Sequence, residues 1–537
     1  MKNKFLPAVK SLAQVANRFD EEASSLKKNL LQTLCKLSLP HDKNILPYHE
    51  LLLFLCAYPG NPPLKTLAEN ELQRIALFGK QIRSGKITLP ENEGLPYGNT
   101  VTRFSPDFLS WLLLHKDLQV EFDSFYDPTL SLNDVLNITL PATLKAETTA
   151  GLNNEDLLEV LHIKPRQYIP FILGQLEQLK DMPLLKELFN ERLDPYVKLV
   201  PKNAAFSKAN NRVPAKQVYY HNDLLKHFNP VQLINEPLQK VRIPGKAECT
   251  ACCNVIKNSM ALTVREIDPA TFLEAGTLRL YDLERGLVFA MYSMIPNRQL
   301  PLETYFGFTF FKNGIPVSYG GIWAFGKMGK IGVNIFEPYR GGESGYILCQ
   351  LLRVMKQVMG IHYVEIEPFQ FGLDNPDGIN SGAFWFYYKF GFRPVDNTLK
   401  QLATDEYHKI KNRKNYRSSA KILLRFTESN IGINLGKKLP MNVLTVTGKI
   451  LSVIKNAWHH NYHEPKIRAV EIFCKQVKLD TAGLTKTEKN VLEDIALWAM
   501  AMKITNPQQL QLMKQMVFTK TTDDYAYQQL LLDFFEA

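Results

Sequence analysis

The chain has 537 residues, of which 45% are hydrophobic and 22% are charged. One hydrophobic core does not serve a chain of this length, so we expect two to four domains, and the composition excludes a largely disordered protein. The formal net charge of +11 permits contact with nucleic acid, anionic lipid or an acidic cofactor and identifies none of them.

The cysteines and the apolar segments bear on the cellular setting. Seven irregularly spaced cysteines, with an N-terminus that lacks a sustained apolar region and a convincing cleavage site, favour a reducing, cytoplasmic setting. The apolar run Leu51–Tyr58 is far shorter than the roughly 20 residues that cross a bilayer. It predicts a buried helix, and no membrane span is expected.

The first part of the chain reads as an α-helical region over residues 1–200, because apolar residues recur near helical spacing and proline-rich turns separate the runs. Residues 201–259 are predicted to connect this region to the next. The connection begins with the polar, basic stretch Pro201–Gln217, which has little apolar content and two prolines.

The predicted secondary structure changes from about Met260. Met260–Phe272 predicts a strand followed by a turn, and Thr277–Met294 predicts one or two helices. Two β-rich runs then flank Asn313-Gly314, the dipeptide of a tight hairpin turn. The run Lys330–Pro338 predicts a third strand of the same meander.

Helical spacing returns in Glu343–Gly360, which Gly360 is expected to end. Its apolar face comprises Ile347, Leu348, Leu351, Leu352, Met355 and Met359. A strand is predicted in His362–Phe369, and a helix that crosses between two strands of one sheet implies that those strands are parallel. Phe392–Asp396 and Lys421–Thr427 predict two late strands. We therefore expect an α+β domain over residues 260–428, followed by an α-helical region over residues 429–537.

Two stretches of this domain could carry chemistry. In Phe336–Leu348 a strand, a glycine-rich turn and a helix follow one another, and such a turn offers backbone N–H groups and the positive end of a helix dipole to an anion. In Asn380–Phe392 seven of thirteen residues are aromatic, and Gly391 suits a left-handed helix end. Each stretch alone favours an ordinary structural role.

Together the two stretches resemble the GNAT acetyltransferase superfamily. Its loop pattern, Gln/Arg-x-x-Gly-x-Gly/Ala, matches "RGGESG" at Arg340 and Gly345, with Glu343 in place of a glycine. A carboxylate beside a pyrophosphate is unfavourable unless it points away. Its later pattern, Asn-x-x-Ala-x-x-x-Tyr-x-x-x-Gly-Phe, matches at every fixed position, which are Asn380, Ala383, Tyr387, Gly391 and Phe392. The resemblance covers about residues 262–426.

The resemblance implies a mixed, mostly antiparallel splayed sheet and an acyl-CoA-dependent N-acyltransferase, with acetyl-CoA or another acyl-CoA as co-substrate. The acceptor would be an amine of a small molecule, peptide or protein. Residues implied to hold the cofactor are Val333, Asn334, Ile335 and Phe336 for the pantetheine arm and thioester, Arg340, Gly341, Gly342, Ser344 and Gly345 for the pyrophosphate, and Asn380 at the splay. No metal is implied.

Tyr387 stands where the family places a tyrosine that protonates the departing thiolate, and a phenol with a pKa near 10 suits that task. A general base for the amine is less defined. Glu365 and Glu367 lie on one face of a strand, about 6.6 Å apart, and Glu337 ends the preceding strand. Each of them could equally pair with a lysine or arginine, and a water chain could serve as the base instead.

Two alternatives stay open. A non-catalytic GNAT-like scaffold is indicated by Glu343 in the loop and by the large helical flanks. An aminoacyl-tRNA-dependent ligase of related fold is compatible with the excess of basic residues. The sequence, however, shows only one copy of the GNAT-like core, whereas such ligases usually have two. The segment His408–Arg425, with seven Lys or Arg residues and no acid, could contact a phosphate, RNA or an acidic partner, although a solvated loop is the simpler interpretation.

Overall fold

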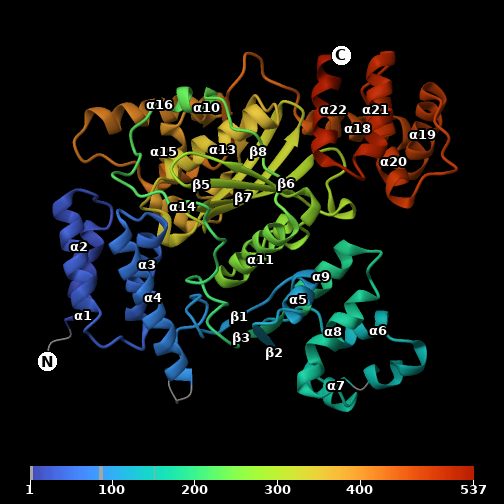
Figure 1. Ribbon diagram of the computed structural model, residues 1–537. Coiled ribbons are helices and arrows are strands. Elements are labelled where there is room, and N and C mark those ends of the chain that lie inside the picture. Colours follow the sequence, from blue (N-terminus) through green and yellow to red (C-terminus); the bar gives the residue numbers. More distant parts are fainter. Residues whose placement is uncertain (1–3, 84–88, 150) are drawn as a thin grey trace. The chain divides into compact units, whose positions relative to one another are not determined.

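The computed structural model describes residues 4–83, 89–149 and 151–537, and they form two compact units (Figure 1). The first unit comprises the chain up to Asp223 together with Thr250–Thr271 and Lys312–Pro316. The second unit comprises Leu224–Cys249, Phe272–Phe311 and Val317–Ala537. Each unit is described by itself below.

The first unit combines helices with a small antiparallel sheet. The helices are α1 (Phe5–Val15), α2 (Glu21–Leu34), α3 (Leu46–Ala57), α4 (Pro62–Arg83), α5 (Pro106–Leu113), α6 (Leu132–Thr139), α7 (Asn154–Val160), α8 (Tyr168–Glu177), α9 (Pro183–Leu193), most of α11 (Lys246–Thr263) and α12 (Asp268–Thr271). The strands are β1 (Thr100–Thr102), β2 (Leu118–Phe125) and β3 (Pro195–Pro201), in the order β1-β3-β2. The apolar run at Leu51–Tyr58 lies in α3 and is buried except for its first residue, as predicted.

One element of this unit corrects the sequence prediction. Met260–Thr263, expected to begin a strand, is the last turn of α11. The strand prediction followed the apolar residues Met260 and Leu262, both of which are buried, but these continue a helical face that includes Val255 and Ile256. A short window does not distinguish a buried helix end from a strand.

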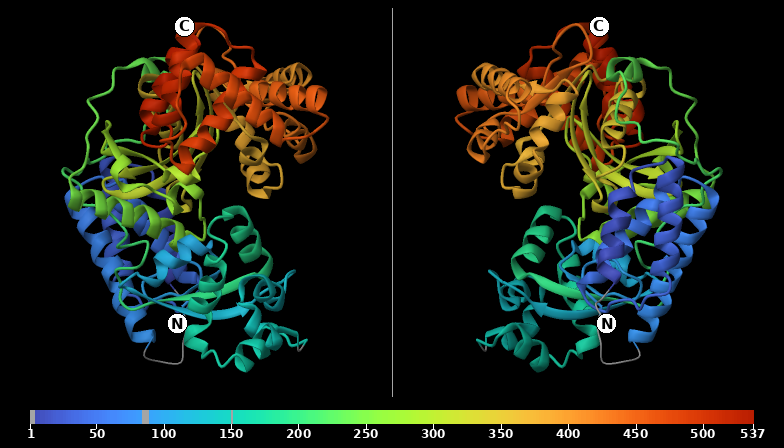
Figure 2. Two further views of the ribbon diagram at one scale, coloured as in Figure 1. Left: turned by 90° about the vertical axis from the view of Figure 1, so that its right-hand side faces the viewer. Right: turned by 90° about the vertical axis from the view of Figure 1, so that its left-hand side faces the viewer.

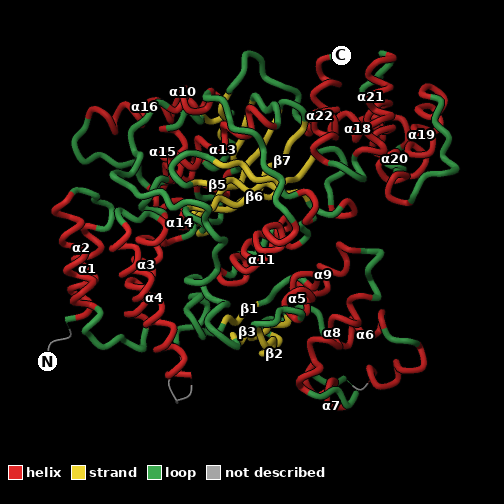
Figure 3. Tube along the Cα trace, viewed as in Figure 1, coloured by secondary structure: helices red, strands yellow, loops and turns green. Residues whose placement is uncertain are grey.

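The second unit is built on an open eight-stranded sheet in the order β10-β11-β9-β8-β7-β6-β5-β4. Figure 3 labels three of its strands, β5, β6 and β7, among the yellow segments. The strands are β4 (Arg279–Asp282), β5 (Leu287–Ser293), β6 (Thr304–Lys312), β7 (Ile315–Phe325), β8 (Met328–Ile335), β9 (Tyr363–Ile366), β10 (Arg393–Pro394) and β11 (Ile431–Asn434). The β4–β5, β7–β8, β9–β11 and β10–β11 pairs are antiparallel, whereas β8 and β9 are parallel. The protein is therefore of mixed α+β class, with a sheet rich in antiparallel pairs.

The centre of this sheet confirms the predicted meander and crossover. Asn313 and Gly314 take positive φ angles of 49° and 83° in the turn between β6 and β7. The crossover helix α13 (Ser344–Val358) joins the parallel strands β8 and β9, and Gly360 follows it with a φ of 66°. All six residues of the predicted apolar face are buried, as the periodicity required.

The segment predicted as one or two helices is instead the hairpin β4–β5. Its turn places Arg285 and Gly286 at φ angles of 61° and 70°. A two-residue turn with both φ angles positive matches the twist of the flanking strands, but it usually carries Asn or Asp before the glycine. Because an arginine stands at this position, the sequence did not predict the turn, and the flanking charged residues resembled the exposed surface of a helix.

One of the two late strands is also corrected. Residues 392–396 contain the short strand β10, but Ala420–Phe426 forms the helix α17, which Ser419 caps by accepting a hydrogen bond from the Ile422 N–H. The last strand is β11, which begins five residues later. The segment Lys421–Thr427 misled because Leu423 and Phe426, three residues apart, are its buried positions, which is a helical spacing.

Helices complete the second unit. They are α10 (Pro230–Asn235), α14 (Pro376–Ser381), α15 (Ala383–Lys389), α16 (Asn397–Asn412), α18 (Val443–Trp458), α19 (His463–Val477), α20 (Lys486–Ala501), α21 (Pro507–Thr519) and α22 (Asp524–Glu536). The last five are the orange and red helices of Figure 2. They share a core that contains the buried Trp498, whose ring lies 5.4 Å from that of Phe325 on β7. The helical C-terminal region therefore shares a core with one end of the sheet.

Asp494 of α20 makes this core sensitive to pH. Burial raises the pKa of its carboxyl to about 6, above the ordinary value of 3.8. Because the folded pKa exceeds the unfolded one, its stabilising contribution is complete below about pH 4 and is lost as the pH rises through about 6. We expect Asp494→Asn to raise the free energy of unfolding at pH 7 by up to about 3 kcal/mol and to have little effect at pH 4.

Thermal unfolding of the two proteins at both pH values measures this difference. Glu471→Gln is the control, because Glu471 is exposed on the neighbouring helix α19 and its ion pair with Arg468 is solvated. We expect it to shift stability by less than about 0.5 kcal/mol at either pH. An Asp494→Asn variant that is less stable at pH 7 would contradict the prediction.

No helix in the described part of the chain is long and apolar enough to cross a membrane.

Candidate functional site

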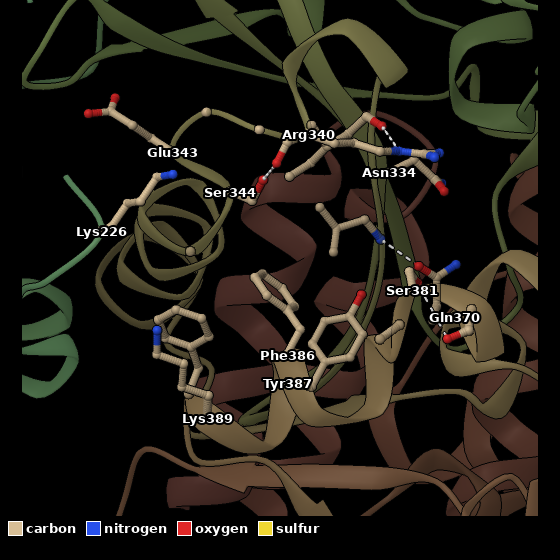
Figure 4. Close-up of a pocket in the computed structure, with 18 of the residues that line it drawn as sticks. Lys226, Asn334, Arg340, Glu343, Ser344, Gln370, Ser381, Phe386, Tyr387 and Lys389 are labelled. Carbon is tan, nitrogen blue, oxygen red and sulfur yellow. Dashed lines mark hydrogen bonds between the residues drawn. The ribbon is translucent and has the colours of Figure 1, made fainter. Parts of the chain in front are cut away.

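A pocket of about 530 Å³ lies at the end of β8, where the sheet opens (Figure 4). The parallel register of β8 and β9 runs from the pair Met328–Tyr363 to the pair Ile331–Ile366. β9 ends at Ile366, whereas β8 continues four residues further to Ile335. The edge of β8 beyond Ile331 therefore faces the pocket without a neighbouring strand. Val333, Asn334 and Ile335, which the resemblance implies as arm-binding residues, all line the pocket.

The side chain of Gln370 fills part of the missing strand's place. Its Oε1 accepts a hydrogen bond of 3.2 Å from the Val333 N–H, and it extends from the 3₁₀ turn Pro368–Phe371 that follows β9 (Figure 4). Phe336, by contrast, is withdrawn from the pocket, because its N–H donates to the Val317 carbonyl and its buried ring stacks on Tyr319. Val333 thus carries the backbone N–H that a ligand would meet, and an amide oxygen already occupies it.

The turn between β8 and α13 presents backbone donors. The first helical bond of α13 runs from the Ile347 N–H to the Glu343 carbonyl, and no acceptor among the described residues binds the N–H groups of Gly341, Ser344 or Gly345. The N-terminus of a helix favours an anion because these N–H groups and the helix dipole act together. Arg340, Gly341, Gly342, Ser344 and Gly345 all line the pocket, so the loop lies where the sequence placed it.

Three cations line the pocket. Arg340, Lys226 and Lys389 line the pocket, and their side chains come from the loop, from the segment before α10 and from the end of α15. Arg340 is folded back, donating to the Ile335 carbonyl at 3.2 Å and to Glu337 at 3.1 Å. Figure 4 shows Lys226 and Glu343 on one side of the start of α13 and Arg340 on the other. The positive charge and the backbone donors converge on one end of the pocket.

Glu343 does not place its charge in that end. Its side chain is buried, and its Oε1 accepts hydrogen bonds from the Arg285 Nε at 2.8 Å and from the Leu225 N–H at 2.9 Å. A second nitrogen of Arg285 lies 2.8 Å from the same oxygen. The departure from the family's glycine is therefore accommodated, since the carboxylate points away from the loop and is neutralised by an arginine of the β4–β5 turn.

The aromatic stretch Asn380–Phe392 is not one helix. Gly382, with a φ of 66°, separates α14 from α15, and Gly391, with a φ of 103°, follows the end of α15 as predicted. A Cβ on Gly345 would lie 2.2 Å from the ring of Phe390, so this glycine allows α13 and the end of α15 to approach. Asn380, predicted to hold the cofactor, is exposed and does not line the pocket, whereas Gly378 and Ser381 of the same short helix do.

Tyr387 lines the pocket, and its hydroxyl points into it beside Phe386 (Figure 4). The ring is 5% exposed, and burial raises the pKa of the phenol well above its ordinary value near 10. In the described part of the chain no group is hydrogen-bonded to this hydroxyl. Tyr387 is therefore a protonated donor that faces a cavity, which is the condition a proton-transfer role requires.

The three acids proposed as bases lie elsewhere, since none lines the pocket. Glu337 pairs with Arg340 at 3.1 Å, and Glu367 pairs with Lys330 at 3.1 Å. Glu365 is buried and accepts a hydrogen bond of 2.8 Å from Asn430. The structure thus favours the salt-bridge interpretation for the first two and a structural hydrogen bond for the third. Besides Glu343, the acid that lines the pocket is Asp377, which is exposed.

Sequence reasoning missed the charged residues Lys226, Asp377 and Lys389 and the amide Gln370 among those that line the pocket, as well as Leu225, Phe228, Asn375, Gly378 and Ser381. Lys226 belongs to the segment that was predicted to connect two domains, and it precedes the loop beside which it lines the pocket by more than a hundred residues. Lys389 lies inside the aromatic stretch. Its position as a basic residue at the end of a predicted helix was a sequence signal that could have identified it. Nothing in the order of residues indicated that Gln370 would reach the edge of β8.

The basic segment His408–Arg425 is partly ordered by one acid. Glu406 of α16 is fully buried and accepts hydrogen bonds from Lys409, Tyr416 and Ser418, each at 2.8 Å. The Tyr416 hydroxyl is thus engaged in holding the turn between α16 and α17. The interpretation as a loop applies only to residues 413–419, because 408–412 lie in α16 and 420–425 lie in α17.

Comparisons with family models, curated proteins and solved structures found no match to this chain. Among the described residues, no group of three or more His, Cys, Asp or Glu side chains could hold a metal ion. The chemistry of the site is therefore argued from its own geometry.

Proposed function

We propose that the pocket binds acyl-CoA and that the protein is an N-acyltransferase with a GNAT-like core. One observation carries the proposal: the open edge of β8, the cationic start of α13 and the Tyr387 hydroxyl line a single pocket, although they come from separate segments. These are the three groups that a thioester on a pyrophosphate-bearing arm needs. The order of strand, helix, strand and aromatic helix, with β8 and β9 parallel, supports the resemblance.

The reaction would be direct transfer. The nitrogen of an acceptor amine attacks the thioester carbonyl carbon, the new C–N bond forms, and the C–S bond breaks to release a thiolate. The Val333 N–H would bind the carbonyl oxygen as negative charge develops on it. Tyr387 would donate its proton to the sulfur, and the proton lost by the amine would return to the phenolate through water. The products are an amide and free CoA.

Binding of acetyl-CoA is the first test. We expect calorimetry to detect acetyl-CoA binding and to find much weaker binding of pantetheine, which lacks the phosphates. The double variant Lys226→Gln/Lys389→Gln should weaken acetyl-CoA binding about tenfold or more and leave pantetheine unchanged, because it removes charges that face only the phosphates. A lack of acetyl-CoA binding at millimolar concentration would exclude the proposed function.

Gln370 leads to a second prediction. A ligand carbonyl that binds the Val333 N–H has to displace the Gln370 amide, so the resting contact opposes binding. We expect Gln370→Ala to strengthen acetyl-CoA binding about fivefold, the equivalent of one hydrogen bond that no longer has to be exchanged. Pantetheine affinity should rise by the same factor, since the effect acts on the arm. An affinity that falls for both ligands would show that Gln370 contacts the ligand instead.

A non-catalytic module that binds CoA or another phosphate-bearing ligand is the second candidate. Two observations favour it: the amide of Gln370 occupies the Val333 N–H, and Glu337, Glu365 and Glu367 are engaged away from the pocket. Binding of acetyl-CoA without release of CoA in the presence of a panel of small amines, peptides and proteins would favour this candidate.

A further inference from the structure

The segment from Ser429 to His463 carries charge of one sign only. It contains no Asp, no Glu and no Arg, while it carries Lys437, Lys438, Lys449 and Lys455. The basic segment His408–Arg425 is another run without an acid, whereas the whole chain has 64 basic and 53 acidic residues. A run of this length with lysines and no acid presents a positive surface that no carboxylate of the same segment offsets.

Large apolar side chains are exposed along the same segment. Leu439, Leu444 and Leu451 are 70%, 61% and 52% exposed, and Met441 is also exposed. Another side of α18 is buried, with Val443 and Val446 in the core of the C-terminal helices. Leu444, Leu451 and Lys455 follow one another at intervals of seven and four residues, so they share one stripe of the helix. Lys438, which is exposed, precedes Leu439 directly. We call Lys438, Leu439, Met441, Leu444, Leu451 and Lys455 the α18 surface.

Exposed leucines alone do not distinguish this surface. Leu184 and Leu188 on α9 are 78% and 44% exposed and also lie one turn apart. That helix, however, carries Glu187 and Glu191 between and beside the leucines. The combination found on α18, exposed leucines with lysines and no acid, is the one that an anionic surface would attract.

The composition of the α18 surface indicates lipid more than protein. Protein interfaces are enriched in arginine and depleted in lysine, whereas every cation of this segment is a lysine. Lysine can extend its charge to the headgroups while its stem and the neighbouring leucines lie against acyl chains. The segment also has Trp458 at the end of α18 and the exposed Tyr462 just beyond, and such amphipathic rings favour the membrane interface.

We propose that the α18 surface binds the surface of an anionic membrane, with α18 lying along the interface and Leu439, Leu444 and Leu451 inserted among the lipids. The lysines supply long-range attraction, which salt screens, and the leucines supply the apolar contact. The attachment is peripheral and independent of the pocket.

Co-sedimentation of the full chain with vesicles tests the proposal. We expect binding to vesicles of equal parts phosphatidylcholine and phosphatidylglycerol, weak binding to phosphatidylcholine alone, and a decline as salt is raised. Lys438→Gln/Lys455→Gln should lower the partition coefficient about fivefold for each lysine, and Leu444→Gln/Leu451→Gln about tenfold or more. The matched control Leu184→Gln/Leu188→Gln should bind as the parent does.

Each other outcome overturns the proposal. The residues changed are exposed, so unaltered thermal unfolding of the variants would establish that the fold is kept. Failure of the folded parent to bind anionic vesicles, or equal binding of the α18 variants and the parent, would exclude the α18 surface as a lipid site. If instead sedimentation velocity without vesicles showed a dimer that only the α18 variants dissolve, the surface would be a contact between copies of the chain.

Discussion

Replacing Arg285 with alanine is expected to lower the free energy of unfolding by about 3–5 kcal/mol, because it breaks an ion pair with a buried carboxylate. Glu343 is 2% exposed, and Arg285 contacts it through two nitrogens, each 2.8 Å from Oε1. Thermal unfolding of Arg285→Ala against the parent measures the loss.

The same substitution should weaken acetyl-CoA binding, because Glu343 would no longer be held away from the loop by Arg285 and its negative charge could turn toward the phosphates. Adding Glu343→Gln to Arg285→Ala removes that charge, so we expect the double variant to regain most of both stability and affinity. Arg18→Ala is the matched control, because Arg18 pairs with Asp20 and Glu22 on the exposed surface and its loss should change stability little. A double variant as unstable as the single one would show that Arg285 acts through other contacts.

The ion pair also shows where sequence reasoning stops. The loop pattern around Arg340, the crossover helix and the parallel pairing of β8 with β9 were predictable, because each depends on periodicity or on turn residues that lie close together in the chain. The orientation of Glu343 was not, because it depends on an arginine 58 positions away. That arginine lies in a turn whose strands were themselves mistaken for helices.

The pocket residues likewise divide into those that local sequence patterns predicted and those that only the fold brings together. Tyr387, Arg340 and the glycines of the loop were found from local patterns, and the structure places them in one cavity. Lys226 and Gln370 enter it from segments without a recognisable motif, and only the fold brings them there. The prediction that these acids act as general bases was not supported, for a related reason. Alternation along a strand predicts that Glu365 and Glu367 share a face, but it does not predict that Asn430 and Lys330 lie beside them.

The second large effect is expected at Tyr387. If the pocket carries out acyl transfer, Tyr387→Phe should lower kcat about 10²–10⁴-fold, which is the usual contribution of a positioned general acid. The affinity for acetyl-CoA should stay within about twofold, since the phenol meets the sulfur only as it leaves. Release of CoA thiol in the presence of an amine acceptor measures the rate, and calorimetry measures the binding.

The neighbouring Tyr388 provides the control for this prediction, and the pH dependence of the rate tests the mechanism. Tyr388 is equally buried but faces Arg393, whose guanidinium lies 3.6 Å from its ring centre, and it does not line the pocket. Tyr388→Phe should therefore leave kcat nearly unchanged. Because burial raises the pKa of Tyr387, the parent should show no loss of rate from its ionisation up to about pH 10. Equal rates for Tyr387→Phe and the parent would exclude the hydroxyl as the proton donor, while intact acetyl-CoA binding would still assign the pocket to a CoA ligand.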